Sequence, residues 1–398
     1  MKEPSLLPVT FPSILVNSNV GIAVGMASAI CPFNLGEVCD STIALMKNPE
    51  HDLFETLKGP DFPGGGFMRY DEKELERMYR TGRGSIKVRA RYTYDKSGNR
   101  IEITEIPPTT TVEAIMDKVV DLIKSGKIRE ISDMRDETDL SGLKITIDLK
   151  RGVDAEKLMQ KLYRMTPLED SFSANFNVLI GGTPKVMGVY ELIEEWVAFR
   201  LECVKRRLYF DLKKKQDKLH LLLGLSKILL DIDKAVRIVR ETEEEEEVVP
   251  NLMIGFGIDE VQAEFVAEIK LRHLNREYIL KRTAEVEDLK ADIKRTEEIL
   301  ADKKKIKAVI IEELKAVKKK YTQPRKTMII YVDEAEETEV EEEIPDYAVN
   351  LFLTQEGYFK KITPLSLRMG GEQKLKEGDA ISTSVESTNT AELLFFTD

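Results

Sequence analysis

A run of small and apolar residues near the amino terminus contains the first side chain that could act on a ligand. Residues 15–26 read LVNSNVGIAVGM, and Gly21 and Gly25 flank Ile22 within this run. The spacing alone favours a packed glycine-rich turn. The alternative is that Ile22 is exposed and enters a base step of DNA. Such an apolar wedge costs on the order of a few kcal/mol of unstacking, which extra wrapped contact offsets.

Basic side chains follow in or beside a stretch that alternates like a β-strand. They are Arg80, Arg83, Lys87, Arg89 and Arg91. Because successive side chains of a strand point to opposite faces, the last three would share one face. A solvated charged face explains such a row, and so does a surface for phosphate oxygens. The TGRG sequence at 81–84 leaves the same choice open, since its glycines also suit a turn.

The sequence contains no recognisable metal site, nucleotide-binding motif or disulfide framework. His51, His220 and His273 stand alone, without histidine or cysteine at metal-ligand spacing. The sequence contains no phosphate-loop motif for ATP. Its cysteines are too few and too scattered for a disulfide framework and are expected to be reduced thiols: Cys31, Cys39 and Cys203. We therefore predict that this chain binds no metal and no nucleotide cofactor.

The composition fits a protein of several units with long solvated helices. A chain of 398 residues is longer than one hydrophobic core usually supports, so several domains are expected. Hydrophobic residues make up 42% of the chain and charged residues 33%. Its apolar runs fall far below the roughly 18 residues that span a bilayer. The amino terminus, MKEPSLLPVTFP, lacks a signal-peptide core. These features predict a cytoplasmic protein that does not enter a membrane.

The net charge of −11 is distributed unevenly. Two acidic runs, residues 241–247 and 333–346, hold fifteen carboxylates and no lysine or arginine, so the rest of the chain carries +4. That remainder can present basic faces to phosphate, because affinity follows local charge and not the total.

Hydrophobic patterning predicts mixed α+β structure over residues 1–188. Alternating stretches indicate strands, and helical spacing after cap residues such as Thr111 indicates helices. The expected segments are strands at 85–94, 100–106 and 143–149 and helices at 111–125 and 154–163.

Residues 189–326 are predicted to form an antiparallel coiled coil. Helical patterning in its first helix continues to about Val239. A second helix is expected from near Asp259, with a narrow heptad seam over residues 286–321. The apolar segment between the helices is expected to form a compact knob, residues 221–275, with an apolar patch available for pairing.

The remainder of the chain is predicted to be a strand, an acidic linker and a small sheet. The strand and linker occupy residues 327–346. Four short strands are expected within residues 347–398, at 347–354, 358–362, 380–385 and 392–397. A single four-stranded sheet rarely buries enough apolar surface to be stable by itself. We therefore expect the natural protein to continue into similar units.

Three motifs occur in an order that is specific to one family. They are FP at 11–12 leading into GIAVGMA, GPDFPG at 59–64 and YRTGRG at 79–84. With EIP at 105–107, RDETD at 135–139 and KR at 150–151, they resemble the A subunit of gyrase and topoisomerase IV, the bacterial type IIA DNA topoisomerases. The resemblance covers nearly the whole chain.

The resemblance implies a DNA-bending tower domain over residues 1–188, with Ile22 as the intercalating residue and the basic side chains named above on phosphate. It makes the knob at 221–275 the dimer contact of an exit gate, the C-gate. Residues 347–398 become the incomplete first blade of a carboxy-terminal β-pinwheel. The implied partners are DNA, a second copy of this chain and the B subunit, in an A2B2 complex whose B subunit binds Mg and ATP.

Arg69 and Tyr70 imitate the arginine and tyrosine that the family uses to cleave DNA. In the family that tyrosine precedes the GIAVGMA run, whereas Tyr70 follows it, so Tyr70 is not expected to be the nucleophile. The resemblance implies that the chain begins after the cleavage domain and does not cleave DNA alone. Glu372, within LRMGGEQK at 367–374, replaces part of a basic box of gyrase. We therefore expect relaxation and decatenation, as by topoisomerase IV.

Two other interpretations stay open. A scaffold protein that dimerises without acting on DNA would need only the coiled coil at 189–326. A complete enzyme would use Tyr70 as its nucleophile.

Overall fold

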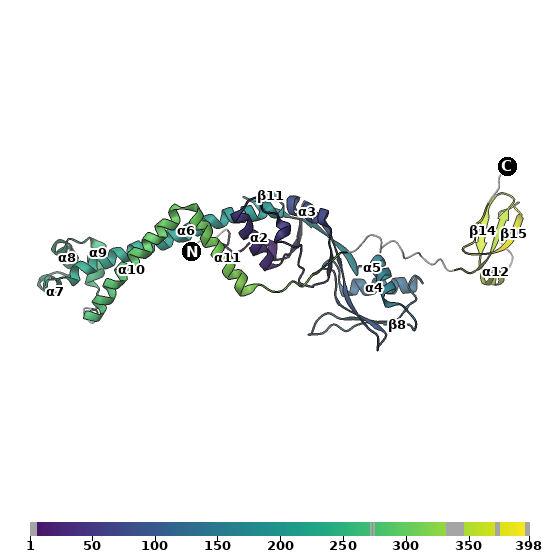
Figure 1. Ribbon diagram of the computed structural model, residues 1–398, viewed down its shortest axis with the longest axis horizontal. Coiled ribbons are helices and arrows are strands. Elements are labelled where there is room, and N and C mark those ends of the chain that lie inside the picture. Colours follow the sequence, from purple (N-terminus) through teal and green to yellow (C-terminus); the bar gives the residue numbers. More distant parts are fainter. Residues whose placement is uncertain (1–5, 271–272, 274, 332–345, 371–374, 395–398) are drawn as a thin grey trace. The chain divides into compact units, whose positions relative to one another are not determined.

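The computed structural model describes residues 6–270, 273, 275–331, 346–370 and 375–394. The chain divides into two compact units, Met1–Tyr331 and Val332–Asp398, and each is described by itself (Figure 1). Both units combine helices with strands, which confirms the predicted α+β class.

A six-stranded sheet forms the centre of the first unit. Its order is β1 (Asn19–Ala23), β2 (Met26–Ile30), β9 (Glu169–Asn175), β4 (Arg83–Arg89), β3 (Phe67–Arg69) and β12 (Met328–Ile330). Neighbouring strands are antiparallel except β12, which runs parallel to β3. The core beside it includes Phe33, Met68, Tyr79, Ile86 and Phe172. Four short helical elements contribute to this core: α1 (Ser13–Val16), α2 (Leu35–Lys47), η1 (Leu53–Glu55) and α3 (Glu72–Thr81).

A four-stranded sheet with its own core lies next along the chain. Its order is β5 (Arg91–Asp95), β6 (Arg100–Glu105), β8 (Ile145–Leu149) and β7 (Ile131–Asp136). The helices α4 (Val112–Lys124) and α5 (Ala155–Met165) pack on it through a shared core of isoleucine, leucine and valine. Both helices begin where predicted, because the Thr111 and Asp154 side chains accept hydrogen bonds from their first-turn amides.

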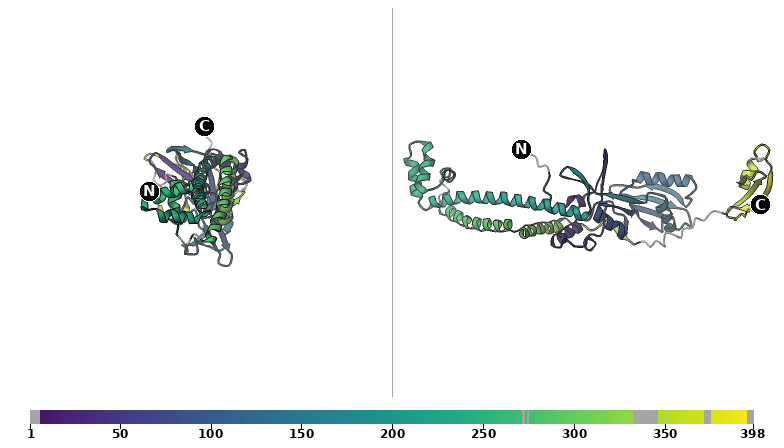
Figure 2. Two further views of the ribbon diagram at one scale, coloured as in Figure 1. Left: turned by 90° about the vertical axis from the view of Figure 1, so that its left-hand side faces the viewer. Right: turned by 90° about the horizontal axis from the view of Figure 1, so that it is seen from above.

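A stem of long helices continues from these sheets, as predicted (Figures 1 and 2). The helix α6 (Val189–Leu229) has 41 residues. Two helices, α10 (Arg276–Ala301) and α11 (Lys303–Tyr321), lie against it in the opposite direction. Buried Val204, Ile306, Ile310 and Leu314 form part of the seam, and Arg207 pairs with Glu313 across it at 2.6 Å.

The boundaries of these helices differ from the prediction. The first long helix ends at Leu229 and not near Val239, because Asp231 caps a separate helix, α7 (Ile232–Glu241). The second does not start near Asp259. There the chain forms the short α9 (Glu260–Ala267), and α10 begins at Arg276.

The second long helix is also interrupted at Asp302, whose side chain caps α11 by accepting the Lys304 amide at 2.8 Å. The predicted heptad seam fails at its last position, since Tyr321 is exposed.

The segment between the long helices folds into a small helical knob. It consists of the end of α6, then α7, η2 (Glu245–Glu247), α8 (Val248–Phe256) and α9. A core of its own holds these elements together, with Leu222, Leu225, Ile228, Leu252 and Ala263 among its buried members. The first acidic run therefore lies within the knob.

The chain after α11 returns to the base of the stem. Lys318 donates to both carboxylate oxygens of Asp40 on α2, at 2.7 and 2.6 Å. Arg325 pairs with Glu37 at 2.9 Å and donates to the Pro60 carbonyl. These contacts position β12, a strand that was predicted, at the edge of the six-stranded sheet.

The second unit is a three-stranded sheet with one helix. Its order is β14 (Phe359–Ile362), β13 (Ala348–Thr354) and β15 (Ile381–Thr388), all antiparallel, with α12 (Pro364–Gly370) after β14. Three of the predicted strands are confirmed, but residues 392–394 form no strand. The rest of that segment, the linker residues 332–345 and Glu372 lie outside the described residues.

Candidate nucleic-acid interface

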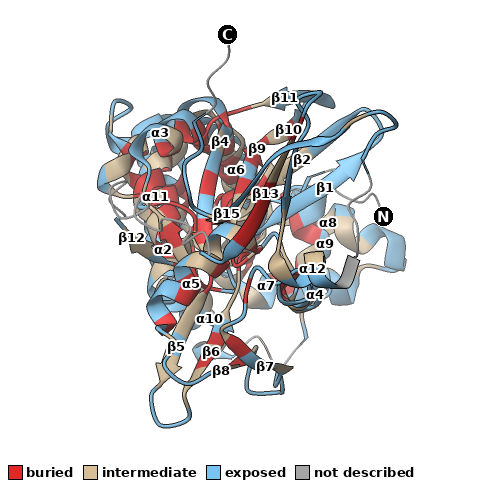
Figure 3. Ribbon diagram, turned by 90° about the vertical axis from the view of Figure 1, so that its right-hand side faces the viewer, coloured by how far each residue is buried: buried red, intermediate tan, exposed pale blue. Residues whose placement is uncertain are grey.

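Residues 19–27 of the β1–β2 hairpin are exposed to solvent (Figure 3). All five residues of β1 are exposed, and Ile22 is 92% exposed. Val24 and Gly25 close the hairpin, and Gly25 has φ +82°, a conformation that glycine favours. A packed turn is therefore wrong for this run, and Ile22 is exposed as the alternative requires.

Strand register places Ile22 and Arg83 on one face of the six-stranded sheet. Directly opposite residues of an antiparallel pair project to the same side. Ile22 is opposite Ala27 on β2. Two residues further along β2, Ala29 is opposite Asn175 on β9. Asn175 is in turn opposite Arg83 on β4. We call this the outer face, because the alternate residues of β4 project into the core.

Lys87 and several serines extend the outer face. Lys87 follows Arg83 by four residues, so strand alternation places both on this face, and both are exposed. Ser85, Ser171 and Ser173 occupy the neighbouring positions in the register. Hydroxyl groups beside lysine and arginine suit contacts with phosphate and sugar oxygens. The sequence analysis did not single out these serines, although Ser85 and Lys87 both flank buried Ile86 on the alternating strand.

Arg89 is less exposed and is held by the sheet. It forms an ion pair with Glu169, its cross-strand partner, and its guanidinium lies 5.1 Å from the centre of the Tyr163 ring. Glu169 also lies 3.4 Å from Arg69 and 4.0 Å from Lys87. Because one carboxylate is shared among several cations, this part of the outer face keeps an excess of positive charge.

The predicted single row of cations is wrong in part. The segment 85–94 is not one strand, since buried Ala90 separates β4 from β5. Arg91 therefore lies in the four-stranded sheet, where it pairs with Glu105 at 3.4 Å. Arg80 lies on α3 and pairs with Glu76 at 2.9 Å. The other cations named from the sequence share β4.

The glycines of TGRG serve close packing. Gly82 ends α3 with φ +70°, and a Cβ there would lie 2.2 Å from the carbonyl oxygen of Met187. A Cβ on Gly84 would lie 2.8 Å from the Glu74 carbonyl oxygen. Both glycines are explained by their neighbours without a bound phosphate.

Tyr70 lies at the edge of the six-stranded sheet, beside Tyr331. Its ring lies 5.0 Å from the ring of Tyr331, and its backbone amide donates to the Ile330 carbonyl. Desolvation raises the pKa of the Tyr70 phenol, and the negative charge of Glu72 raises it further. Less phenolate is therefore present than on a free tyrosine, whereas a nucleophile needs a lowered pKa or an adjacent base.

The cysteines have structural positions. All three are buried. Desolvation raises the pKa of the Cys31 thiol and raises the pKa of Cys39 to about 11. Thiols of this kind are poor nucleophiles and poor metal ligands. Within the described part of the chain, no group of three His, Cys, Asp or Glu side chains has the geometry to hold a metal ion.

The knob exposes large apolar side chains. Leu230 is 87% exposed and Ile254 is 84% exposed, and three valines of the knob are exposed as well. We call the five residues the knob patch: Leu230, Val236, Val239, Ile254 and Val261. Large apolar side chains exposed on a small unit are available for an interaction surface.

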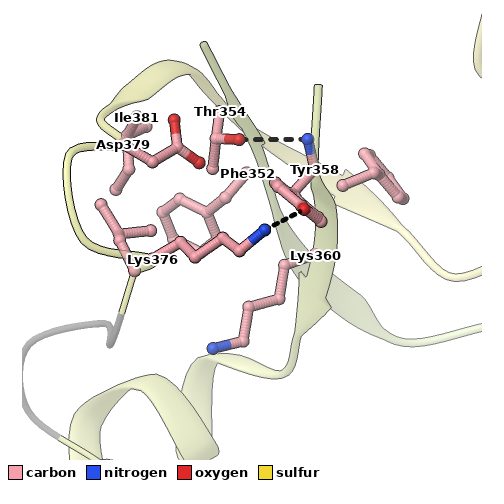
Figure 4. Close-up of a pocket in the computed structure, with 9 residues that line it drawn as sticks. Phe352, Thr354, Tyr358, Lys360, Lys376, Asp379 and Ile381 are labelled. Atoms are coloured by element: carbon pink, nitrogen blue, oxygen red, sulfur yellow. Dashed lines mark hydrogen bonds between the residues drawn. The ribbon is translucent and has the colours of Figure 1, made fainter. Parts of the chain in front are cut away.

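The second unit contains a pocket of about 360 Å³ beside β13 and β14 (Figure 4). Its polar groups are already engaged. Lys376 donates to the Tyr358 hydroxyl at 2.8 Å, and the Asp379 carboxylate accepts the Ala380 amide at 2.8 Å. These contacts fold the loop before β15 and supply no catalytic arrangement.

Comparison with known proteins shows the family. Residues 1–315 match the family model for the A subunit of DNA gyrase/topoisomerase IV. The chain is 34% identical over 415 residues to the DNA gyrase A subunit of Synechocystis sp., which covers all of this chain and 48% of that protein. It is 36% identical over 410 residues to the DNA gyrase A subunit of Clostridium acetobutylicum, which covers all of this chain and 49% of that protein.

A plant organellar protein is similar to the same degree. The chain is 35% identical over 412 residues to the chloroplastic/mitochondrial DNA gyrase A subunit of Nicotiana benthamiana, with all of this chain and 44% of that protein covered. The chain belongs to the family of DNA gyrase/topoisomerase IV A subunits, as its motifs predicted. It spans about half the length of the curated relatives it matches. In the described ranges no helix has the length and apolar character to cross a membrane.

Proposed function

We propose that this chain is part of the A subunit of an ATP-dependent type IIA DNA topoisomerase, which passes one duplex through a transient double-strand break in another. The chain bends the cleaved duplex, the gate DNA, and supplies the C-gate dimer contact, without cleaving DNA itself. The observation that carries this proposal is the position of Ile22, which is exposed at a hairpin on the same sheet face as Arg83 and Lys87.

The outer face has the two properties that DNA bending requires. Arg83 and Lys87 supply sequence-independent attraction to phosphate, and Arg89 on the same face is bound to Glu169. Ile22 supplies an apolar wedge that opens a base step and kinks the duplex. Arg80 and Arg91, on α3 and β5, lie outside the outer face, and we assign them to other phosphates of the duplex.

The partners follow from the same proposal. The knob patch pairs with the knob patch of a second copy and forms the C-gate. A two-fold contact requires a self-complementary surface, and an apolar patch meets that condition without placing like charges opposite each other. The complete enzyme is a cytoplasmic A2B2 complex, in which the B subunit binds Mg and ATP.

Two candidate outcomes for DNA topology have support. Glu372 in place of a basic residue favours relaxation and decatenation, as by topoisomerase IV. The named relatives are gyrase subunits, which favours supercoiling. The complete A2B2 enzyme, reconstituted from full-length subunits and supplied with ATP, decides between them on relaxed plasmid. The first outcome is supported if the plasmid stays relaxed and linked circles are decatenated. The second is supported if the plasmid becomes negatively supercoiled.

DNA bending is tested with a duplex of about 30 base pairs that carries a donor and an acceptor dye at its ends. Saturating amounts of this chain should bring the ends together, and Ile22→Ala should leave the duplex bound but straighter. Leu140→Ala is the matched control, because Leu140 is a fully exposed leucine outside the hairpin. Unchanged energy transfer with Ile22→Ala would contradict the wedge.

The scaffold alternative predicts a different result. A dimeric coiled-coil protein without DNA function would show no salt-dependent affinity for duplex DNA. Reversal of charge at Lys87 would then change neither the binding nor the bending of the duplex.

A further inference from the structure

We infer that Asn175 and Asn177 are positioning residues that hold the Ile22 hairpin upright for insertion into DNA. This inference rests on the proposed function, because it concerns how the wedge is supported. Neither asparagine belongs to a motif that the sequence singled out, and both lie about 150 residues from the hairpin in sequence.

The hairpin has little backbone support of its own. Within the described residues, β2 is paired with β9 at a single position, Ala29 opposite Asn175. Beyond that position the β1–β2 ladder continues to the turn, and residues 19–27 of the hairpin are exposed. An isolated two-stranded hairpin is marginally stable in water, so a side-chain support is needed to fix its direction.

Side-chain hydrogen bonds supply that support next to the wedge. The Asn175 Nδ2 donates to the Ala27 carbonyl at 2.9 Å, and the Asn177 Nδ2 donates to the same oxygen at 3.4 Å. Ser28 Oγ donates in return to the Asn177 carbonyl at 2.9 Å. Ala27 is the residue directly opposite Ile22. The support is therefore applied at the level of the inserted side chain.

The two asparagines are themselves fixed. Asn175 ends β9, a strand of the six-stranded sheet, and Asn177 begins β10 (Asn177–Ile180), which pairs with β11 (Thr183–Val186). Phe176, between them, is fully buried in the core of the unit. Force on the wedge therefore passes through Ala27 into the sheet.

The chemistry of asparagine suits this position. Opening a base step costs on the order of a few kcal/mol, and a hairpin that pivots would avoid that cost by lying against the groove. An amide donates to a carbonyl without carrying charge. Aspartate would lose the donor and repel phosphate, and lysine would be drawn to phosphate and leave the hairpin.

The first test needs no DNA. Hydrogen exchange of the β1–β2 backbone amides is measured in the free 398-residue chain for the unmutated protein and for Asn175→Ala with Asn177→Ala. Loss of both donors should speed hairpin exchange about tenfold, as expected for side-chain hydrogen bonds of ordinary strength, with the sheet core unchanged. Asn251→Ala is the matched control, because Asn251 donates to Thr242 in the knob.

Ser28 provides a second, conservative series. Ser28→Ala removes the donor to Asn177 and should also speed exchange in the hairpin, whereas Ser28→Thr keeps a hydroxyl and should restore protection. Hairpin exchange that is the same in all these variants would overturn the inference, and so would equal acceleration throughout the sheet, which would show only general destabilisation.

The second test uses the bending assay. The double asparagine variant should bind duplex DNA with nearly unchanged affinity, because the cations remain, yet bend it about as little as Ile22→Ala. If Ile22→Ala straightens the duplex and the asparagine variant does not, the inference fails and the proposed function stands. If Ile22→Ala itself leaves the bend unchanged, the proposed function fails.

Discussion

Ile22 and Arg83 share one face of the six-stranded sheet, although about 60 positions of sequence and two intervening strands separate them. The relationship follows from register alone, through the opposite pairs Ile22 with Ala27, Ala29 with Asn175 and Asn175 with Arg83. In the proposed function it joins an apolar wedge to a cationic surface. A duplex that lies on the cations therefore meets the wedge without any rearrangement of the sheet.

The cations of the outer face should make DNA affinity depend on salt concentration, because each phosphate contact releases counterions. Arg83→Ala and Lys87→Ala should each weaken binding to any duplex sequence and lower the slope of log affinity against log salt by about 1, since each phosphate contact releases about one counterion. Fluorescence anisotropy over a range of NaCl measures the slope. Lys124→Ala, an exposed lysine on α4, should leave the slope unchanged. Equal slopes for all three variants would remove the outer face from the DNA contact.

Arg89 should behave differently, because it supports the sheet. Arg89→Ala leaves the partly buried Glu169 with fewer cations and removes the contact with the Tyr163 ring. The expected loss of stability is about 2–3 kcal/mol, seen as a lower midpoint when thermal unfolding is followed by circular dichroism. Arg89→Lys keeps the charge and should recover part of the loss. A midpoint equal to that of Lys87→Ala would contradict the supporting role.

The knob patch should determine oligomeric state. Leu230→Lys together with Ile254→Lys places charges on its most exposed positions and should convert a dimer into a monomer. Light scattering over a concentration series distinguishes a mass near 45.4 kDa from twice that value. Leu140→Lys changes an equally exposed leucine outside the knob and should remain dimeric. Dimerisation of the knob variant would place the interface elsewhere, and a monomeric unmutated chain would contradict the proposed dimer.

The knob should lose stability in acid through Asp259. Its pKa is lowered from 3.8, first by the Gln262 backbone amide that it caps and also by His220, whose Nε2 lies 2.6 Å away. A carboxyl with a lowered folded pKa stabilises the fold above its unfolded pKa, and this contribution disappears as pH falls through the folded value. Melting temperature should therefore fall below about pH 4.

Asp259→Asn isolates this effect. Asparagine is also a good N-cap but does not titrate, so the variant should keep α9 capped and lose less melting temperature between about pH 6 and pH 3 than the unmutated chain. The same loss in both proteins would show that other carboxyls dominate the acid response.

Tyr70 should be dispensable for DNA chemistry. Burial and Glu72 raise the pKa of its phenol, so little phenolate is present at neutral pH. We expect no covalent adduct with duplex DNA from this chain, and the same absence from Tyr70→Phe, when the products are separated on denaturing gels. An adduct that forms with the unmutated chain and disappears in Tyr70→Phe would establish the complete-enzyme alternative.

Elements with a strong internal period could be predicted from the sequence. The helix α4 starts at its threonine cap, and β8 lies inside the predicted 143–149 because apolar and polar residues alternate there. The breaks in the stem were missed because apolar spacing continues through them. Asp231 and Asp302 mark those breaks, since an aspartate before a helical run is a cap signal, but its weight is small beside the hydrophobic pattern.

The candidate site was predictable only in part. The resemblance implied that Ile22 is exposed, whereas its spacing alone favoured a packed turn, and strand alternation indicated which cations share a face. Alternation also continues through buried Ala90, so no local signal shows that Arg91 has passed into another sheet. The hydrogen bonds of Asn175 and Asn177 to Ala27 join segments that are distant in sequence, and strand order decides such contacts.

The most direct measurement of the central claim is base unstacking at the wedge. The fluorescent base 2-aminopurine is placed at successive positions of a gate duplex, and its emission is recorded with saturating protein, because emission rises when the base loses its stacking neighbour. We predict a rise at two symmetric positions with the unmutated dimer and at neither with Ile22→Ala, while both proteins stay bound. Unchanged emission at every position, or the same rise with Ile22→Ala, would contradict insertion of Ile22 into DNA.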